Sequence, residues 1–257
     1  MECCSRFELM SVFRFKKFDV VNELSAMKVN TDGVLLGAAM TLRSTDRALL
    51  DVGTGTGTIA LMAAQRVTDL LENSSHGGSV QVDAIDIDEP SASEAAKNFA
   101  DSPWKDILRA YNLPLNEFAA SEACGMYDLI FSNPPYFEDS LTAPDERKST
   151  ARHASDGLSY RDIFEFAVDH LMVDGRVALV LPADQEHALA RYARMCGFHL
   201  FRIMRIRTVP RKAPSRIIAE FSRLRCEAPE VTLLTIQNEG QYTEEYLSLT
   251  HDFYLFA

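Results

Sequence analysis

The sequence predicts a doubly wound α/β fold, in which a mostly parallel sheet carries helices on both faces. From about Ala48 onward, apolar runs typical of strands alternate with stretches at helical spacing, and such alternation indicates parallel strands joined by crossover helices. The last apolar runs follow one another without a helix, which predicts a closing hairpin and an antiparallel edge strand. A length of 257 residues, with 47% hydrophobic and 25% charged residues, is typical of a globular protein with a full core.

The first elements follow from apolar runs and caps. Residues 48–53 (ALLDVG) form an apolar run that ends in Asp and Gly, as expected of a buried parallel strand. Residues 58–71 predict a helix, because apolar side chains recur on one side: Ile59, Met62, Ala63, Val67 and Leu70. After a polar loop at 73–79, residues 80–86 (VQVDAID) are the second strand. Asp88 can cap the next helix, whose first turn holds Pro90.

The later elements follow in the same way. Residues 107–113 predict a weaker third strand, and 127–133 (YDLIFSN) a clear fourth. Ser159 and Asp162 resemble a capping box before a helix over 163–171. A fifth strand is expected at 176–183, followed by a helix to Cys196 that Gly197 ends. The remaining strands are expected at 199–208, 216–225 and 231–237, with a long turn between the first two.

Composition and cysteine usage exclude several classes of protein. The five cysteines are scattered and include no CxxC pair, which indicates reduced cytoplasmic thiols and no metal site. The amino terminus carries acid and base before any apolar stretch, so we expect no secretory signal. No apolar run approaches the ~18 residues of a membrane span. A net charge of −11 argues against general affinity for nucleic acid.

A glycine loop, Asp51-Val52-Gly53-Thr54-Gly55-Thr56-Gly57, joins the first strand to the first helix. Glycines there let the backbone approach a ligand, and the helix N-terminus offers free N–H groups. The pattern also fits the GxGxxA fingerprint of dinucleotide binding, and a tight turn without a ligand is a further alternative. Asp51 would repel a pyrophosphate but suits the cationic end of S-adenosylmethionine, which we favour. Asp86, at the end of the second strand, can accept hydrogen bonds from a ribose.

The tetrapeptide Asn133-Pro134-Pro135-Tyr136 follows the fourth strand, at the edge where open α/β sheets bind ligands. Two prolines fix the backbone and leave a rigid stretch rich in acceptors. The Asn133 side-chain oxygen and the Pro134 carbonyl suit the two hydrogens of a planar amino group, and Tyr136 offers a face for stacking a base. The four residues are therefore candidates for catalysis. A plain Asn-Pro turn is the alternative.

The glycine loop and NPPY together resemble class I S-adenosylmethionine-dependent methyltransferases that modify planar amino groups of adenine, cytosine or glutamine. Further stretches resemble the tRNA(1)(Val) adenine(37)-N6 methyltransferase family more closely. They are FKKF at 15–18, MKVNTDGVLLG at 27–37, SPW at 102–104, ARH at 151–153, RKAPSR at 211–216 and DFYL at 252–255.

The resemblance implies a seven-stranded methyltransferase sheet, with a Rossmann-like domain over 48–257. Residues 1–47 are expected to be an aromatic and basic segment and a cofactor-flanking helix of the same domain. The expected cofactor-binding residues are Lys28, Thr31, Asp32, Asp51, Gly53, Gly55, Gly57, Asp86 and Ile87. In one departure, Pro114 stands about where many relatives place an acid that contacts the cofactor's adenine, so no residue is assigned to that contact.

Basic residues gather in the C-terminal third, where 202–225 holds eight Lys and Arg and one acid, a local charge of +7. Arg14, Lys16 and Lys17 lie among phenylalanines, a combination suited to phosphates and a stacked base. Arg147, Lys148, Arg152 and His153 follow NPPY and could border the same pocket. The expected substrate-binding residues are Arg14, Lys16, Lys17, Arg152, Arg211, Lys212 and Arg216. Solvated strand residues are the alternative interpretation of the charge.

These observations and the resemblance predict a cytoplasmic, monomeric enzyme that methylates N6 of adenine 37 in the anticodon loop of a valine tRNA, with no metal and no membrane partner. An unpaired loop presents a base without melting a duplex. One alternative is a glutamine-N5 protein methyltransferase, which would leave the basic segment without a purpose. The other is a catalytically silent RNA-binding protein on the same fold.

Overall fold

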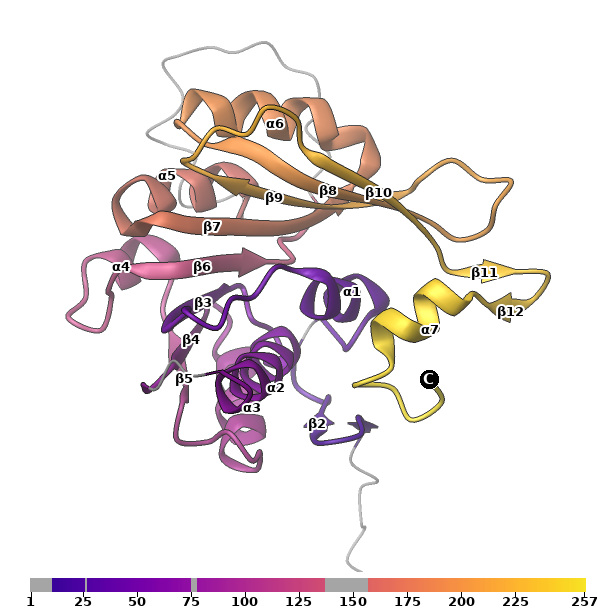
Figure 1. Ribbon diagram of the computed structural model, residues 1–257. Coiled ribbons are helices and arrows are strands. Elements are labelled where there is room, and N and C mark those ends of the chain that lie inside the picture. The colour runs from indigo at the N-terminus through magenta and orange to yellow at the C-terminus, as the bar shows by residue number, and fades with distance from the viewer. Residues whose placement is uncertain (1–10, 26, 75–77, 137–156) are drawn as a thin grey trace, which may run out of the picture.

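A central sheet of eight strands forms the middle of the computed structural model, which describes residues 11–25, 27–74, 78–136 and 157–257. The strands lie side by side in the order β10–β8–β9–β7–β6–β3–β4–β5 (Figure 1). Their bounds in chain order are Ala48–Val52 (β3), Gln81–Asp86 (β4), Leu108–Asn112 (β5), Tyr127–Ser132 (β6), Leu171–Pro182 (β7), His199–Arg207 (β8), Arg216–Ser222 (β9) and Glu230–Thr235 (β10).

Seven of these strands run in one direction, and β9 runs against them. It pairs antiparallel with β7 on one side and β8 on the other, so that Ala219 faces both Leu179 and Ile203. The predicted fold class, a mostly parallel doubly wound sheet, is confirmed. Two details are wrong, because the sheet has eight strands rather than seven and the antiparallel strand lies inside it rather than at an edge.

The difference in burial between β9 and β10 explains why β9 lies inside the sheet and β10 at its edge. Ile217, Ile218 and Phe221 of β9 are at most 1% exposed, and a strand buried on both faces is stabilised by neighbours on both sides. The hairpin from β8 therefore inserts its second strand between β8 and β7. By contrast, Val231 and Leu233 of β10 are 53% and 52% exposed, and this strand is the edge, parallel to β8.

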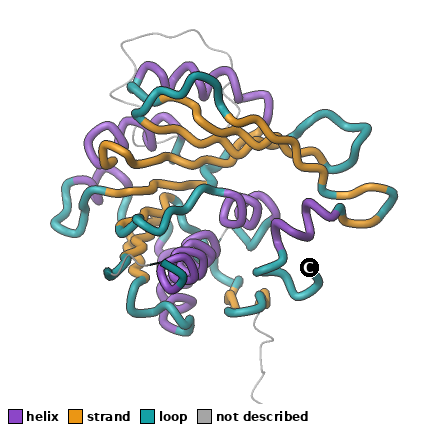
Figure 2. Tube along the Cα trace, viewed as in Figure 1, coloured by secondary structure: helices purple, strands orange, loops and turns teal. Residues whose placement is uncertain are grey.

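Helices cover both faces of the sheet, as Figure 2 shows. One hydrophobic cluster joins the sheet to α1 (Thr31–Ala39), α2 (Thr58–Glu72), α3 (Glu89–Ala100) and α7 (Glu244–Thr250). A second joins it to α4 (Leu115–Ala119), α5 (Tyr160–His170) and α6 (Glu186–Met195), which a 3₁₀ turn at Ala183–Gln185 precedes. The expected caps of α3 and α5 form, with Asp88 accepting from the Ser91 amide and Ser159 and Asp162 making a capping box. None of the described helices is long and apolar enough to cross a lipid bilayer.

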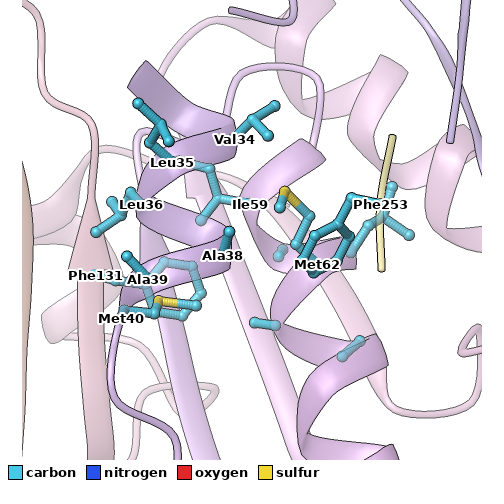
Figure 3. Close-up of a cluster of buried hydrophobic side chains, with 14 of the residues drawn as sticks. Val34, Leu35, Leu36, Ala38, Ala39, Met40, Ile59, Met62, Phe131 and Phe253 are labelled. Carbon is cyan, nitrogen blue, oxygen red and sulfur yellow. The ribbon is translucent and has the colours of Figure 1, made fainter. Parts of the chain in front are cut away.

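Helix α1 lies almost wholly inside the molecule, between the sheet and α2 (Figure 3). Its close packing needs Gly37, because a Cβ there would lie 2.7 Å from Sδ of Met62 on α2. Asn30 caps the helix by accepting a hydrogen bond from the Gly33 amide at 2.9 Å. The residues that begin α1 are thereby held next to the glycine loop and NPPY.

The N-terminal hairpin, β1 (Val12–Arg14) and β2 (Asp19–Val21), packs against the end of the chain. Phe15 and Phe18 are 4% and 6% exposed, and their rings stack at 4.5 Å. Trp104 meets Phe18 edge-on, and Tyr254 stacks on Phe15. A second short hairpin, β11 (Gln237–Asn238) and β12 (Gln241–Tyr242), precedes α7.

A buried ionic network ties the segment after α1 to the sheet. Glu220 of β9, 0% exposed, accepts hydrogen bonds from the Thr41 amide, the Thr41 hydroxyl and Nη1 of Arg202. Nearby, Arg176 of β7 pairs with Asp46 at 2.6 Å, with both side chains at most 3% exposed. Because these charges are buried, they stay paired. The pairs hold Thr41 and Asp46, which follow α1 in the chain, and so help to fix the position of α1 on the sheet.

Candidate active site

The glycine loop joins β3 to α2 at the carboxyl edge of the sheet. Gly53, Gly55 and Gly57 have φ of +72°, +58° and +81°, in the left-handed region that favours glycine. A Cβ on Gly57 would lie 2.5 Å from Cε1 of Phe99 on α3, so the loop packs too closely for a larger residue. Gly57 is also the N-cap of α2, and the free N–H groups of this helix end suit a ligand that carries acceptors.

Asp51 of β3 is a buried carboxylate with an unused oxygen. It is 0% exposed; Oδ2 accepts from the Thr54 hydroxyl at 2.8 Å, and Oδ1 has no hydrogen-bond partner within the described part of the chain. Burial raises the pKa of Asp51 from its ordinary 3.8 to about 7, an effect that the Thr54 hydroxyl and the Ala60 amide oppose and the charge of Asp86 adds to. An enclosed acceptor of this kind fits a cationic group of a ligand.

Asp86, at the end of β4, holds the glycine loop in place. Its Oδ2 accepts from the Gly55 amide at 2.8 Å and its Oδ1 from the Asp88 amide at 2.9 Å. Burial raises the pKa of Asp86, and these two amides oppose the rise. Each carboxylate oxygen has a second lone pair, so Asp86 keeps capacity for ribose hydroxyls. The next residue, Ile87, presents a side chain that is 73% exposed.

A cleft opens between the glycine loop, the segment before α1 and NPPY. Its lining residues are Met27, Lys28, Val29, Asn30, Gly33, Gly53, Thr54, Gly55, Thr56, Thr58, Ile59 and Asn133. The predicted cofactor residue Lys28 thus lies at the cleft, although its Nζ donates to the Asn22 and Glu23 carbonyls. Thr31 and Asp32, predicted for the same role, are not among the lining residues.

Two polar residues of α3, neither of them predicted from the sequence, hold the glycine loop and the segment that leads to the cleft. Glu94 is 2% exposed and accepts from the amides of residues 23–25, the shortest bond being 2.6 Å to Glu23. Asn98 accepts from the Val21 amide and donates to the Thr56 carbonyl at 2.9 Å, which links β2 to the glycine loop. The available signal was the place of Glu94 and Asn98, which lie four residues apart in the predicted helix and directly before the apolar Ala95 and Phe99.

Asn133 lies at the cleft with its side-chain oxygen directed toward Tyr136. It is 7% exposed, and its Oδ1 is 2.9 Å from the Tyr136 hydroxyl. The preceding Ser132 donates to the Val52 carbonyl at 2.6 Å, which couples the end of β6 to the end of β3. The structure therefore brings the catalytic candidate of NPPY to the same cleft as the glycine loop, as the motifs predict.

Tyr136, Asp32 and Arg216 form one cluster beside Asn133. The Tyr136 hydroxyl lies 3.0 Å from Oδ2 of Asp32, and Nε of Arg216 donates to the same oxygen at 2.7 Å. The Arg216 guanidinium lies over the Tyr136 ring, 5.0 Å from its centroid. Burial, with the charge of Asp32, raises the pKa of Tyr136, so its hydroxyl stays a donor. Asp32 therefore lies on the NPPY side of the site.

Most basic residues of 202–225 are engaged within the protein. Arg202 pairs with Glu220 and Glu230, Arg205 with Glu186, and Arg216 with Asp32. Arg207 and Arg223 donate to nearby oxygen atoms. Arg211 and Lys212, by contrast, are exposed in the turn between β8 and β9, and their side chains make no ion pair or hydrogen bond to another described residue. Acids from outside the segment thus compensate three of its seven excess positive charges.

The N-terminal basic residues are also mostly engaged. Lys16 donates to the His251 and Ala257 carbonyls, and Lys17 pairs with Asp69 at 2.9 Å. Only Arg14 of this predicted set is exposed without such a contact in the described chain. Because Phe15 and Phe18 are in the core, this segment does not present stacked rings to RNA. Arg147, Lys148, Arg152 and His153 lie outside the described residues.

The described residues contain no cluster of His, Cys, Asp and Glu that could hold a metal ion. The fold and the arrangement of glycine loop and NPPY around one cleft define a class I methyltransferase. A family model described as "Methyltransferase small domain" matches residues 24–192. The chain belongs to this family.

Similarity to curated relatives identifies a narrower family. A Parabacteroides distasonis protein named tRNA1(Val) (adenine(37)-N6)-methyltransferase is 41% identical over 244 residues, covering 95% of this chain and 97% of the relative. A Bacteroides fragilis protein of the same name is 37% identical over 243 residues, with coverage of 95% and 97%. The chain therefore belongs to the family of tRNA1(Val) (adenine(37)-N6)-methyltransferases.

Solved structures support the fold alone, because their sequences are distant. An Agrobacterium tumefaciens protein described as a predicted O-methyltransferase has a TM-score of 0.60 at 14% identity, covering 86% of this chain and 96% of its own. A methyltransferase from Pyrococcus furiosus has a TM-score of 0.53 at 20% identity, with coverage of 79% and 89%.

Proposed function

We propose that this protein transfers a methyl group from S-adenosylmethionine to N6 of adenine 37 in a valine tRNA. The observation that carries the proposal is Asn133, which lies with NPPY at the cleft of the glycine loop. The substrate is inferred from relatives at 37–41% identity along nearly the whole chain. We further infer a cytoplasmic, monomeric enzyme in which residues 1–47 and 48–257 form one domain.

S-adenosylmethionine, when bound, supplies an electrophilic methyl group. Two carboxylates that contact lining residues of the cleft fit it: Asp51, behind Thr54, offers a buried oxygen for its ammonium group, and Asp86, bonded to Gly55, offers acceptors for its ribose. The exposed Ile87 suits the apolar face of its adenine ring. Since these groups lie along the carboxyl ends of neighbouring strands β3 and β4, one extended ligand can reach all of them.

On the substrate side, Asn133 has the central role. The lone pair of an adenine amine is delocalised into the ring, so the nitrogen is a poor nucleophile. A hydrogen bond from the amine to Oδ1 of Asn133, and a second to the Pro134 carbonyl, would localise that lone pair on nitrogen. The two prolines hold both acceptors in place, so catalysis here is positioning and electrostatics without a general base.

Cofactor affinity should depend on pH through Asp51. The pKa of about 7 means that the carboxylate is largely protonated below pH 7, whereas a bound ammonium group favours its charged form. Binding should therefore be about tenfold weaker at pH 6 than at pH 8 and should release protons in the acidic range. Calorimetry in buffers of different ionisation enthalpy measures both quantities. Asp51→Asn is the matched control, and a wild-type affinity independent of pH would contradict the role of Asp51.

The turn between β8 and β9 is the best-supported RNA contact. It follows the carboxyl end of β8 and projects beyond the ends of the strands (Figure 1). The glycine loop and NPPY follow the carboxyl ends of β3 and β6, which run in the same direction as β8. Arg211 and Lys212 are exposed there. Free cations beside the cleft suit the phosphates that flank a target base.

Replacing both Arg211 and Lys212 with glutamate should weaken tRNA binding and leave cofactor affinity unchanged. If each contacts one phosphate of a single-stranded loop, the slope of log affinity against log salt should decrease by about 1.4. Filter binding at several salt concentrations measures the slope. The control is Lys97→Glu with Lys105→Glu, the same charge change at exposed positions of α3 and the loop after it. Equal effects of the two double variants would exclude a specific role for the turn.

The function is tested by mass spectrometry of nucleosides from unmodified tRNA incubated with the protein and labelled cofactor. We expect N6-methyladenosine at position 37 of a valine tRNA and none in a transcript with guanosine there. Methylation of a glutamine side chain in a protein, with no label in tRNA, would replace the proposal with the alternative enzyme. Cofactor binding without transfer to either substrate would favour a silent RNA-binding protein.

A further inference from the structure

The hydroxyl group of Tyr136 faces two acceptors at nearly equal distances. Oδ1 of Asn133 lies 2.9 Å away and Oδ2 of Asp32 lies 3.0 Å away. A phenol has one hydrogen to donate, so it can make a full hydrogen bond to only one of them at a time. Whether Oδ1 of Asn133 already accepts a hydrogen bond therefore depends on which of the two acceptors this hydrogen is directed to.

The orientation of the Asn133 amide places its oxygen, rather than its amino group, next to the Tyr136 hydroxyl. Its Nδ2 faces Oδ1 of Asn30 at 3.5 Å, and that oxygen already accepts from the Gly33 amide. Because the Asn30 atom is an acceptor, the Asn133 group directed at it is the amino group, and the oxygen is the atom that faces Tyr136. This oxygen is the one to which the adenine amine is proposed to donate.

Asp32 is the stronger of the two acceptors. It forms an ion pair with Arg216, whose Nε lies 2.7 Å from Oδ2, and a carboxylate in such a pair accepts more strongly than a neutral amide. Asp32 also lies in the first turn of α1, where the helix dipole favours a negative charge. Since α1 is almost wholly buried, the carboxylate is held at a fixed place beside NPPY.

We propose that Asp32 is a positioning residue that draws the hydroxyl hydrogen of Tyr136 away from Asn133. An amide oxygen has two lone pairs, but one that already accepts a hydrogen bond accepts a second more weakly. With the Tyr136 hydrogen on Asp32, Asn133 therefore accepts more strongly from the target amine, while Tyr136 keeps its ring in place for stacking. Arg216 supports this role by pairing with Asp32. The inference rests on the proposed function, and it gives Asp32 a role in the reaction instead of one in holding the cofactor.

A double-mutant cycle with Tyr136→Phe tests the proposal. Asp32→Asn replaces the carboxylate with a neutral acceptor of the same shape, and we expect kcat for tRNA methylation to fall about tenfold, the scale of one hydrogen bond. In the Tyr136→Phe background no hydroxyl competes for Asn133, so the same change should lower kcat by less than about twofold. Cofactor affinity and melting temperature should stay close to those of the parent proteins. Asp32→Ala serves as a second variant with no acceptor, and Asp69→Asn on α2 is the control for charge.

An equal loss of kcat in both backgrounds would overturn the proposal, because Asp32 would then act without the Tyr136 hydroxyl. A second measurement needs no tRNA: the side-chain amide resonance of Asn133 in ¹⁵N-labelled protein, assigned with Asn133→Ala. Asp32→Asn should shift this resonance when Tyr136 is present and leave it unchanged in the Tyr136→Phe background. The same shift in both backgrounds, or none in either, would overturn the proposal. An inactive wild type with the expected shifts would refute the proposed substrate and leave the role of Asp32 supported.

Discussion

Asn133→Ala should lower the rate of methyl transfer by about 10²–10³, the usual cost of removing one preorganised hydrogen-bonding group at a reacting centre. The side chain lies at the cleft with its oxygen directed at Tyr136, so alanine removes this acceptor together with the long contact from its amino group to Asn30. Cofactor binding should persist, because Asp51, Asp86 and the glycine loop are untouched. Single-turnover transfer from labelled cofactor to tRNA measures the rate, and calorimetry measures the binding.

Asn133→Asp is the matched comparison, because it keeps an acceptor in the same place. It should retain more activity than alanine if acceptance of the amine hydrogen is what matters. Its added negative charge should also strengthen binding of a cationic cofactor, which calorimetry would detect. Transfer by the alanine variant close to the wild-type rate would refute a central role for Asn133.

Glu220→Ala should lower the free energy of unfolding by about 3–5 kcal/mol, the cost of leaving a buried charge without its partner. Glu220 is 0% exposed and accepts two hydrogen bonds from Thr41 and one from Arg202. Arg66 adds to the cost, because burial already lowers its pKa to about 10 and the charge of Glu220 opposes that lowering. Chemical denaturation measures the free energy.

Glu186→Ala is the control for this change. Glu186 pairs with Arg205 at 2.6 Å, but the two side chains are 19% and 38% exposed. A pair open to solvent contributes about 1 kcal/mol or less. Similar decreases in the free energy of unfolding for the two variants would contradict the larger contribution expected of the buried Glu220 network.

The sequence predicted the strands and helices well where local chemistry decides them. The apolar run before Asp51, the Asp88 cap and the Ser159 capping box each involve neighbours in the chain, and each formed as expected. The place of β9 in the sheet was not predicted, because pairing depends on which strands lie beside it in space. The signal was present, since Ile217, Ile218 and Ala219 are consecutive apolar residues, as in a strand buried on both faces, whereas polar residues interrupt the stretch at 231–237.

The site was predicted in the same uneven way. NPPY and the glycine loop come together because both follow strands of one parallel sheet, which topology alone ensures. The basic residues were harder to interpret, because a sequence does not show that Arg216 has Asp32 as a partner or that Lys16 binds backbone oxygens. Charge counted along a chain overestimates the charge offered to a ligand when the acids that balance it come from distant segments.

The hairpin at residues 12–21 has a consequence for biosynthesis. The Phe15 and Phe18 rings are covered in part by Phe253 and Tyr254, and the Lys16 amide donates to the Phe253 carbonyl at 2.8 Å. A ribosome makes the hairpin first and its cover more than two hundred residues later. During translation Phe18 can gain its Trp104 partner early, but the face of Phe15 that stacks on Tyr254 stays uncovered until the end of the chain is made. The hairpin therefore exposes apolar surface for most of synthesis, a state that favours aggregation.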